Sequence, residues 1–244
     1  MSDEGQTVRL IMLRHGRVAH HRGDVPLTDM GIAQTEAAGA FFASEGIEVA
    51  GVLSGETLRT RDTASRFVAS YRDACDLPIP DPVVSFGLRN PDLYLGSHRI
   101  NLGEGAESLA SQADGVEPAA VEASTFYSGL MTASDRVGYW LEHGNVPGEN
   151  AHDVGRRVDV LARSLVDVES WRGKTVVAVS HSPVMRAVRF HHTGAYSKEP
   201  PFLHGYSLTL GDGGLLDFDY FETCLLYTSP SPRDQRGSRM PSSA

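Results

Sequence analysis

The chain has 244 residues, of which 41% are apolar and 22% charged. This ordinary globular usage excludes a collagen, a coiled coil and a wholly disordered chain. Asp and Glu number 31 against 22 Lys and Arg, a formal net charge of −9, which argues against a nucleic-acid partner. The longest apolar runs are far shorter than the ~20 residues of a membrane span. Two cysteines and an N-terminus without a basic segment predict a cytoplasmic protein that has no disulfide framework and does not contact the membrane.

The first third of the sequence alternates strand and helix patterns. Continuous apolar runs at residues 8–13 and 49–53 are typical of strands buried on both faces of a parallel sheet. Apolar residues at helical spacing predict helices over residues 29–45 and 57–71. A Pro-rich connection then leads to a third predicted strand at residues 83–86.

The sheet pattern disappears between residues 87 and 148. One long helix is predicted there, over residues 118–141, because Phe126, Leu130, Val137 and Leu141 recur at helical spacing. The segment is interpreted as a helical insertion between elements of the core, in a position where specificity is often carried.

The last third returns to the alternating pattern. It contains a predicted helix at residues 150–170, a buried strand at 176–179 and a helix that ends at His192. Strands at residues 207–210 and 215–220 flank a Gly-rich turn and predict a hairpin. Together these elements predict one α/β domain over residues 1–223, with three layers: a mostly parallel central sheet and helices on both of its faces.

The last 21 residues, 224–244, differ from the rest in composition. They hold three Pro and five Ser and show almost no apolar periodicity. Residues 224–234 resemble a translated sequencing adaptor, so the segment is interpreted as an artefact and set aside from fold reasoning. A genuine disordered tail is the alternative.

Basic side chains follow three of the predicted strands. His15 comes directly after the first strand, between Arg14 and Gly16, and His181 comes directly after the strand at 176–179. Arg59 lies near the start of the helix after the second strand. Each alone has a structural interpretation, a hydrogen-bonded histidine or a surface arginine. Because the carboxyl ends of parallel strands meet at one edge of a sheet, we expect the three to share a site.

Several sequence motifs of this chain occur in the same order in one family of known enzymes. They lie at residues 13–16, 26–34, 54–64, 147–158 and 177–187. In these motifs the chain resembles the histidine phosphatase superfamily, the phosphoglycerate mutase-like enzymes. The resemblance extends over roughly residues 8–192, and the combined pattern is specific although each piece alone is not.

The resemblance implies a role for each matching residue. His15 would be the nucleophile that takes the phosphoryl group onto a ring nitrogen, which requires a neutral imidazole. Arg14, Arg59 and His181 would surround the phosphoryl oxygens with positive charge. Water would then hydrolyse the phosphohistidine. The resemblance implies no metal and no cofactor, because these three groups handle the negative charge.

Three further residues are predicted to bind substrate. Gly16 would let the backbone and a ligand approach each other closely. Ser182 stands where the family usually has glycine, and its hydroxyl could donate to the phosphate. His21 lies in the loop after the first strand, where a solvated histidine is the alternative.

The proton donor for the leaving oxygen is the main departure from the family pattern. The family usually has a Glu shortly after the third strand, and none stands there in this chain. Asp92 is the predicted donor, with Glu104 and Glu107 as alternatives. Such a donor must be protonated near neutral pH.

The predicted function is a phosphomonoesterase that acts on a small phosphorylated metabolite. A mutase of the phosphoglycerate type is the first alternative, although the insertion offers only Arg89, Arg99 and Arg136, and no Lys, to retain a doubly phosphorylated intermediate. A non-catalytic phosphate-binding module is the second. The sequence predicts neither the substrate nor the oligomeric state.

Overall fold

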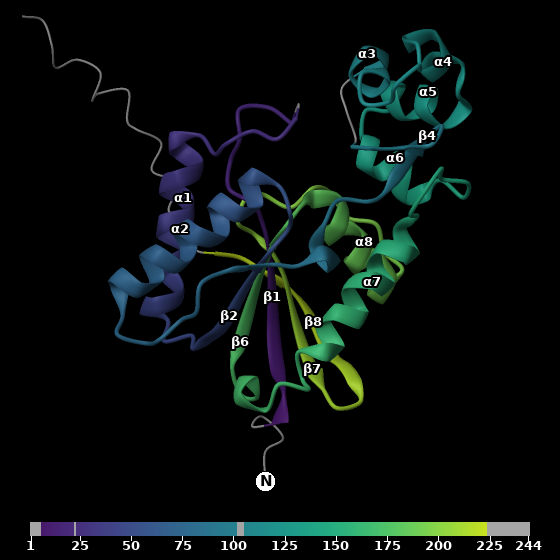
Figure 1. The fold of residues 1–244 in the computed structure, drawn as a ribbon. Helices are drawn as coiled ribbons and strands as arrows, with labels where there is room; N and C mark the ends of the chain where they lie inside the picture. The colour runs from purple at the N-terminus through teal and green to yellow at the C-terminus, as the bar shows by residue number, and fades with distance from the viewer. Residues whose placement is uncertain (1–5, 22, 102–104, 224–244) are drawn as a thin grey trace, which may run out of the picture.

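A six-stranded sheet forms the centre of the computed structural model, which describes residues 6–21, 23–101 and 105–223 (Figure 1). The strands lie in the order β3-β2-β6-β1-β7-β8. They are β1 (Val8–Arg14), β2 (Val49–Ser54), β3 (Val83–Val84), β6 (Thr175–Ser180), β7 (Gly205–Gly211) and β8 (Gly214–Phe221). The four strands from β3 to β1 are parallel, and β7 is antiparallel to both of its neighbours. The predicted mostly parallel sheet and the C-terminal hairpin are confirmed.

Helices cover both faces of the sheet, as Figure 1 shows. On one face lie α1 (Asp29–Ser44) and α2 (Leu58–Ala74), and on the other α7 (Ala151–Ser164) and α8 (Ser182–Thr193). The side chains of successive residues of β1 point to opposite faces of the sheet. Ile11 packs in one apolar cluster with Phe42 and Phe67. Leu10 packs in a separate cluster with Val154. Burial on both faces explains why this strand is a continuous apolar run. The three-layer prediction is therefore confirmed.

Capping side chains fix where two of these helices begin. The Thr28 hydroxyl accepts a hydrogen bond from the Gly31 amide at 3.1 Å, one residue before α1. Asn150 and Asp153 form a reciprocal capping box at the start of α7. The helix predicted over residues 150–170 is shorter in the structure, where α7 ends at Ser164 and a 3-10 turn, η3 (Glu169–Trp171), follows.

The insertion forms a small lobe at the end of the sheet where β1 finishes (Figure 1). It contains a two-stranded hairpin and four short helices: β4 (Leu93–Leu95), β5 (His98–Ile100), α3 (Ala106–Ala110), α4 (Pro118–Ala123), α5 (Thr125–Thr132) and α6 (Arg136–Glu142). A 3-10 turn, η2 (Phe86–Leu88), leads into the lobe from β3. No helix among the described residues is long and apolar enough to cross a bilayer.

The single helix predicted over residues 118–141 is wrong. Ser124 and Asp135 each cap the start of a new helix, because their side chains accept hydrogen bonds from the amides of Tyr127 and Gly138. The apolar spacing continues through these breaks, so Phe126 and Leu130 are buried although the helix is interrupted. The two strands of the β4–β5 hairpin were also not predicted.

An ion pair ties the lobe to the core. Arg186 on α8 has a side chain that is 4% exposed, and its two terminal nitrogens donate to the two oxygens of Asp135 at 2.8 and 2.7 Å. This carboxylate is also the N-cap of α6. One residue therefore starts a lobe helix and holds that helix against the core.

The variant Asp135→Ala should lower the free energy of unfolding by about 2 kcal/mol, since it removes a cap and leaves a buried guanidinium unpaired. Urea unfolding followed by the fluorescence of the buried Trp140 measures the change. Asp135→Asn, which can still cap the helix, should lose less. Stability of the alanine variant equal to that of the unchanged protein would show that this ion pair does not hold the lobe.

Candidate active site

The carboxyl ends of β1, β6 and β2 lie side by side. The parallel register pairs Arg14 with Ser180, and Ser54 with Val179. The next residues continue the ladder, because the His15 amide donates to the Ser180 carbonyl at 3.0 Å. His181 directly follows Ser180. The structure therefore brings His15 and His181 to neighbouring positions at one edge of the sheet, and their ring centres are 5.5 Å apart.

The contacts of His15 determine which of its ring nitrogens can react. The side chain is 2% exposed, and its Nδ1 lies 2.8 Å from the carbonyl oxygen of Gly16. A carbonyl can only accept, so Nδ1 carries the proton and Nε2 keeps its lone pair. Burial lowers the pKa of His15 well below its usual value, the Gly16 contact opposes that shift, and the nearby Arg59 and Arg14 lower the pKa further. His15 is therefore a neutral imidazole with Nε2 available.

His181 is buried to the same extent and is also neutral. Burial lowers its pKa well below the usual value, and the charge of Arg59 acts in the same direction. Its Nε2 lies 3.5 Å from the hydroxyl of Thr57, which is the residue before α2. His181 is also the N-cap of α8, so the free amides at the N-terminus of that helix lie next to His181.

Stability should fall as the pH drops below about 6.5, the usual pKa of histidine. Below that pH the unfolded chain binds protons that His15 and His181 exclude in the folded chain, so each costs up to about 1.4 kcal/mol per pH unit. Urea unfolding at pH 7.5, 6.5 and 5.5 measures this decline. His181→Gln should decline less steeply than the unchanged protein, and identical slopes would contradict the buried neutral state.

Two guanidinium groups flank the histidines. Arg14 is 5% exposed and Arg59 is 7% exposed. Burial lowers the pKa of both, and among the described residues the counter-charge of Arg59 is Asp24, at a long 4.0 Å. The Nε atoms of both arginines are buried without a hydrogen-bond partner. Two buried cations beside two neutral imidazoles form a place where an anion with several oxygens would be stabilised.

The three predicted substrate-binding residues occupy different surroundings. A Cβ atom on Gly16 would lie 2.7 Å from the Thr35 hydroxyl, so the space beside this glycine is filled by α1. The Ser182 hydroxyl is buried and has no hydrogen-bond partner, and Ser182 is the first residue of α8. His21 is exposed, and its ring centre lies 5.8 Å from that of His15.

The loop between α8 and β7 closes one side of the site. The Phe202 ring centre lies 4.0 Å from the guanidinium carbon of Arg14 and 5.7 Å from the ring centre of His15. The two terminal nitrogens of Arg14 contact a Glu199 carboxylate oxygen and the Pro200 carbonyl, each at 2.8 Å. Sequence reasoning missed Glu199 and Pro200, because no local pattern shows which loop will return to the end of β1.

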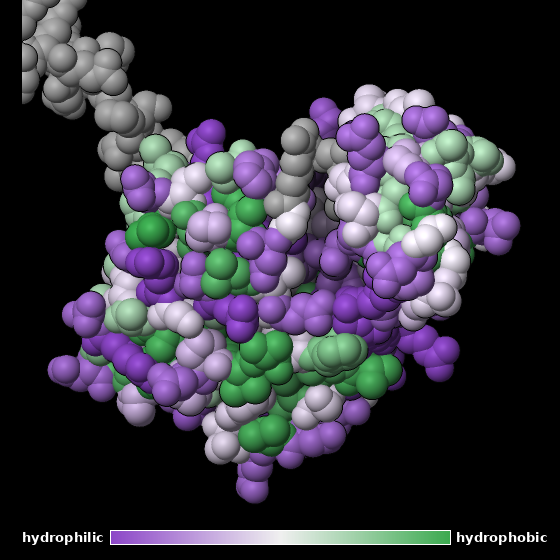
Figure 2. All heavy atoms as spheres, turned by 45° about the horizontal axis from the view of Figure 1, so that its top comes forward, coloured by the Kyte–Doolittle hydropathy of each residue, from purple (hydrophilic) through white to green (hydrophobic). Residues whose placement is uncertain are grey.

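A cavity of about 440 Å³ opens on the other side of Glu199. Its lining is largely polar and comes from the lobe and from α8, and it includes Ser134, Asp135, Arg136 and Arg186. Figure 2 shows the surface hollowed between the lobe and the rest of the molecule. Glu199 lines this cavity and also contacts Arg14, so the cavity adjoins the two arginines and two histidines described above.

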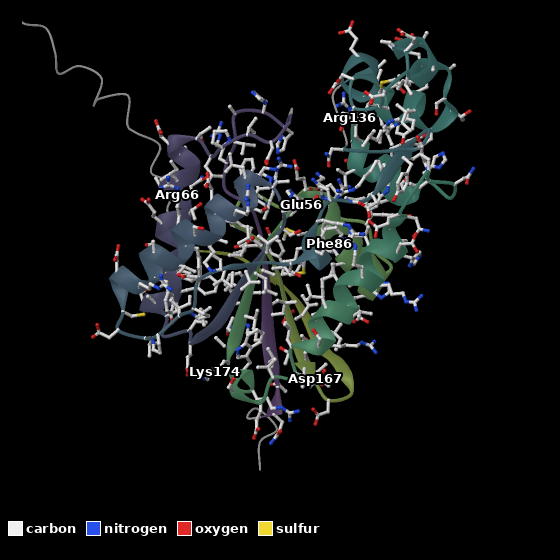
Figure 3. The ribbon with its side chains drawn as sticks, viewed as in Figure 1. Glu56, Arg66, Phe86, Arg136, Asp167 and Lys174 are labelled. Carbon is white, nitrogen blue, oxygen red and sulfur yellow. The ribbon has the colours of Figure 1, made fainter. Side chains whose placement is uncertain are left out.

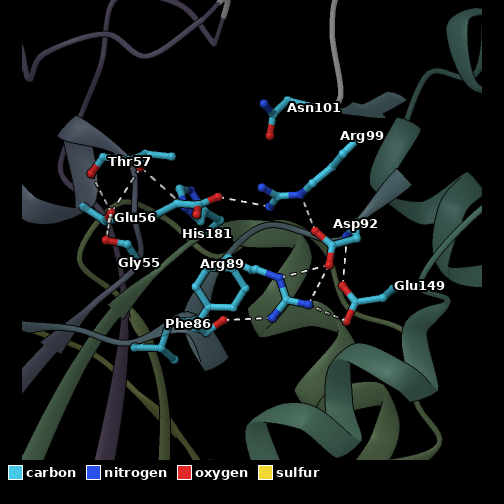
Figure 4. A network of polar contacts seen from close by, with 12 residues as sticks. Gly55, Glu56, Thr57, Phe86, Arg89, Asp92, Arg99, Asn101, Glu149 and His181 are labelled. Atoms are coloured by element: carbon cyan, nitrogen blue, oxygen red, sulfur yellow. Dashed lines mark hydrogen bonds and ion pairs between the residues drawn. The ribbon is translucent and has the colours of Figure 1, made fainter. Parts of the chain in front are cut away.

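Asp92 lies in a network of ion pairs rather than facing the histidines (Figure 4). Its oxygens contact Arg89, at 2.6 Å, and Arg99. Burial alone would raise the pKa of Asp92, but the hydrogen bonds and charges of these two arginines outweigh burial and hold the pKa below its usual value. Since a donor needs a proton near neutral pH, these contacts argue against Asp92 as the proton donor.

The two alternative donors are not found in the site either. Glu107 is exposed on α3, at the far end of the lobe from the sheet (Figure 1). Glu104 lies outside the described residues, as does the segment 224–244 that was interpreted as an artefact.

The N-terminal part of the chain matches a known protein family. Residues 10–77 match the family described as "Histidine phosphatase superfamily (branch 1)". The matched segment runs from β1 to the end of α2 and contains Arg14, His15 and Arg59. No curated protein matches the chain by sequence.

Solved structures share the fold over most of the chain. Mycobacterial glucosyl-3-phosphoglycerate phosphatase superposes with a TM-score of 0.57 at 18% identity, over 88% of this chain and 97% of its own. A protein described as mycobacterial hydrolase 1 gives 0.58 at 19%, over 89% and 99%. Phosphoglycerate mutase from Bacillus anthracis gives 0.56 at 14%, over 90% and 93%. At these identities the likeness concerns the fold.

Proposed function

We propose that the protein is a phosphomonoesterase that hydrolyses a small phosphorylated metabolite through a phosphohistidine on His15. One observation carries the proposal: a neutral imidazole, with its Nε2 lone pair unused, lies within a shell formed by Arg14, Arg59 and His181. Nucleophile and cationic groups at one buried place are what transfer of a phosphoryl group requires.

The reaction proceeds in two steps. His15 Nε2 attacks phosphorus, the bond to the ester oxygen breaks, and a general acid gives one proton to that oxygen so that the alcohol leaves neutral. Water then attacks the phosphohistidine, which returns the lone pair to Nε2 and releases inorganic phosphate. In both steps negative charge on the phosphoryl oxygens faces Arg14 and Arg59, whose forked donors suit a tetrahedral anion.

The lobe favours hydrolysis over a mutase reaction. Arg89 and Arg99 of the lobe are held by Asp92, and Arg89 also contacts Glu149 at 3.2 Å. Arginines that already form ion pairs with carboxylates are poorly placed to bind the second phosphate of a doubly phosphorylated intermediate. The polar cavity beside Glu199 suits a hydroxylated or charged leaving group. Among the structural neighbours, one is named for glucosyl-3-phosphoglycerate, a substrate of that kind.

The proposal is tested by incubating the protein with an aryl phosphate whose phosphorus is labelled. Phosphate should be released, and quenched samples should carry label on the protein that is stable to base and lost in acid, as expected for phosphohistidine. Binding of inorganic phosphate without release of product at any pH would instead indicate a non-catalytic phosphate-binding module.

A further inference from the structure

The proposed hydrolysis needs a proton for the leaving oxygen, and the predicted donor is held by two arginines. Other carboxyl groups lie at the carboxyl edge of the sheet among the described residues. Asp24 and Glu199 contact Arg59 and Arg14 respectively, so both are bound to the cations that would hold the phosphate. Glu56 remains, and it lies in the short segment between β2 and α2.

The residues on either side of Glu56 lie next to His181. On one side, a Cβ atom on Gly55 would lie 3.3 Å from His181 Nε2. On the other side, the Thr57 hydroxyl is 3.5 Å from the same nitrogen. Figure 4 shows the Glu56 side chain extending from this segment past His181 toward the lobe, and Figure 3 places it at the carboxyl edge of the sheet, far from Lys174. About a third of the side chain, 34%, is exposed, so a substrate can reach it.

The charge balance around Glu56 gives it a cationic partner on the lobe. The network contains three arginines, Arg89, Arg99 and Arg157, and their carboxylate partners Asp92 and Glu149 balance two of the three positive charges. The remaining positive charge meets Glu56, because Arg99 Nη2 lies 3.0 Å from its Oε1 (Figure 4). Arg99 is therefore positioned to stabilise a carboxylate that forms at Glu56.

We propose, on the basis of the proposed function, that Glu56 is the general acid and base of the reaction and that Arg99 positions it. The Glu56 carboxyl gives its proton to the ester oxygen as the bond from phosphorus to oxygen breaks, so the alcohol leaves neutral. The resulting carboxylate, held by Arg99, then takes a proton from the water that attacks the phosphohistidine. Glu56 is again protonated and His15 is free.

Glu56 differs from Asp92 because its carboxyl group contacts one arginine through one oxygen, whereas Asp92 contacts two arginines. When the ester bond breaks, the charge on Glu56 is compensated by Arg99. The alternative is an ordinary surface ion pair, which is worth about 0–1 kcal/mol and would not affect chemistry.

The test compares Glu56→Gln with the unchanged protein on two substrates, an alkyl phosphate and 4-nitrophenyl phosphate. The value of kcat/KM reports the first step, in which the leaving oxygen departs. For the alkyl ester it should fall about 10²–10⁴-fold, the usual contribution of general acid catalysis. For the nitrophenyl ester it should change little, because nitrophenolate leaves without a proton.

Matched variants separate this role from structural effects. Glu122→Gln, an exposed carboxylate on α4, should leave both rates unchanged, and Glu56→Asp should regain part of the alkyl activity. Equal losses on both substrates, or no loss on either, would overturn the proposal, as would a loss selective for the alkyl ester in Asp92→Asn alone. If His15→Ala retained both activities, the proposed function would fail, which is a different result.

Discussion

His15→Ala should lower kcat/KM for any phosphate monoester by about 10⁴-fold or more, the usual effect of removing a nucleophile. The His15 imidazole has an unused Nε2 lone pair beside Arg14 and Arg59, and alanine offers no atom that can bond to phosphorus. Arg14, Arg59 and His181 stay in place in this variant, so it should still bind inorganic phosphate. Release of phosphate and phosphate binding by calorimetry measure the two properties separately.

Two controls accompany this experiment. His21→Ala removes an exposed ring 5.8 Å from His15 and should have a far smaller effect, since His21 is predicted to bind substrate and forms no bond to phosphorus. Thermal unfolding of His15→Ala shows that the fold survives. Hydrolysis by His15→Ala at the rate of the unchanged protein would exclude the phosphohistidine route.

Arg59→Ala should lower kcat by about 10³-fold, within the range seen when a group that stabilises transition-state charge is removed. The guanidinium is buried near the two histidines, and its weak contact with Asp24 leaves its charge available to the phosphoryl oxygens. Arg59→Lys should recover only part of the activity, because an ammonium cannot match two oxygens with a planar fork. Steady-state rates on 4-nitrophenyl phosphate measure both variants.

Arg66→Ala is the matched control on the same helix. Arg66 is 40% exposed and pairs with Glu36 at 3.3 Å on the outer surface of α2, so the substitution should leave kcat unchanged. If Arg59→Ala and Arg66→Ala gave the same kcat, Arg59 would have no role in charge stabilisation.

The candidate site could be anticipated from the sequence where the signal is topological. His15 and His181 directly follow continuous apolar runs, and parallel strands place such residues at one edge. Asp92 could not be judged in the same way, since its partners Arg89 and Arg99 decide its charge and one of them belongs to the hairpin that was not predicted. Glu199 likewise reaches Arg14 across a separation that no local pattern encodes.

The fold shows the same division between regular and irregular segments. Strands buried on both faces and amphipathic helices are long enough for periodicity to identify them, as with β6 and α1. The lobe is built from elements of three to eight residues, in which side-chain caps decide the boundaries. Asp135 illustrates this. The apolar spacing predicts one continuous helix through it, whereas in the structure its side chain caps the start of α6.

The contact between Arg14 and Glu199 has a consequence for turnover. A phosphoryl group that approaches Arg14 must compete with an internal carboxylate 2.8 Å from the same nitrogen. Arrival of substrate is then an exchange of one anion for another, and departure of inorganic phosphate is assisted because Glu199 can retake its place. Such an exchange weakens the affinity for substrate in the ground state and product inhibition together.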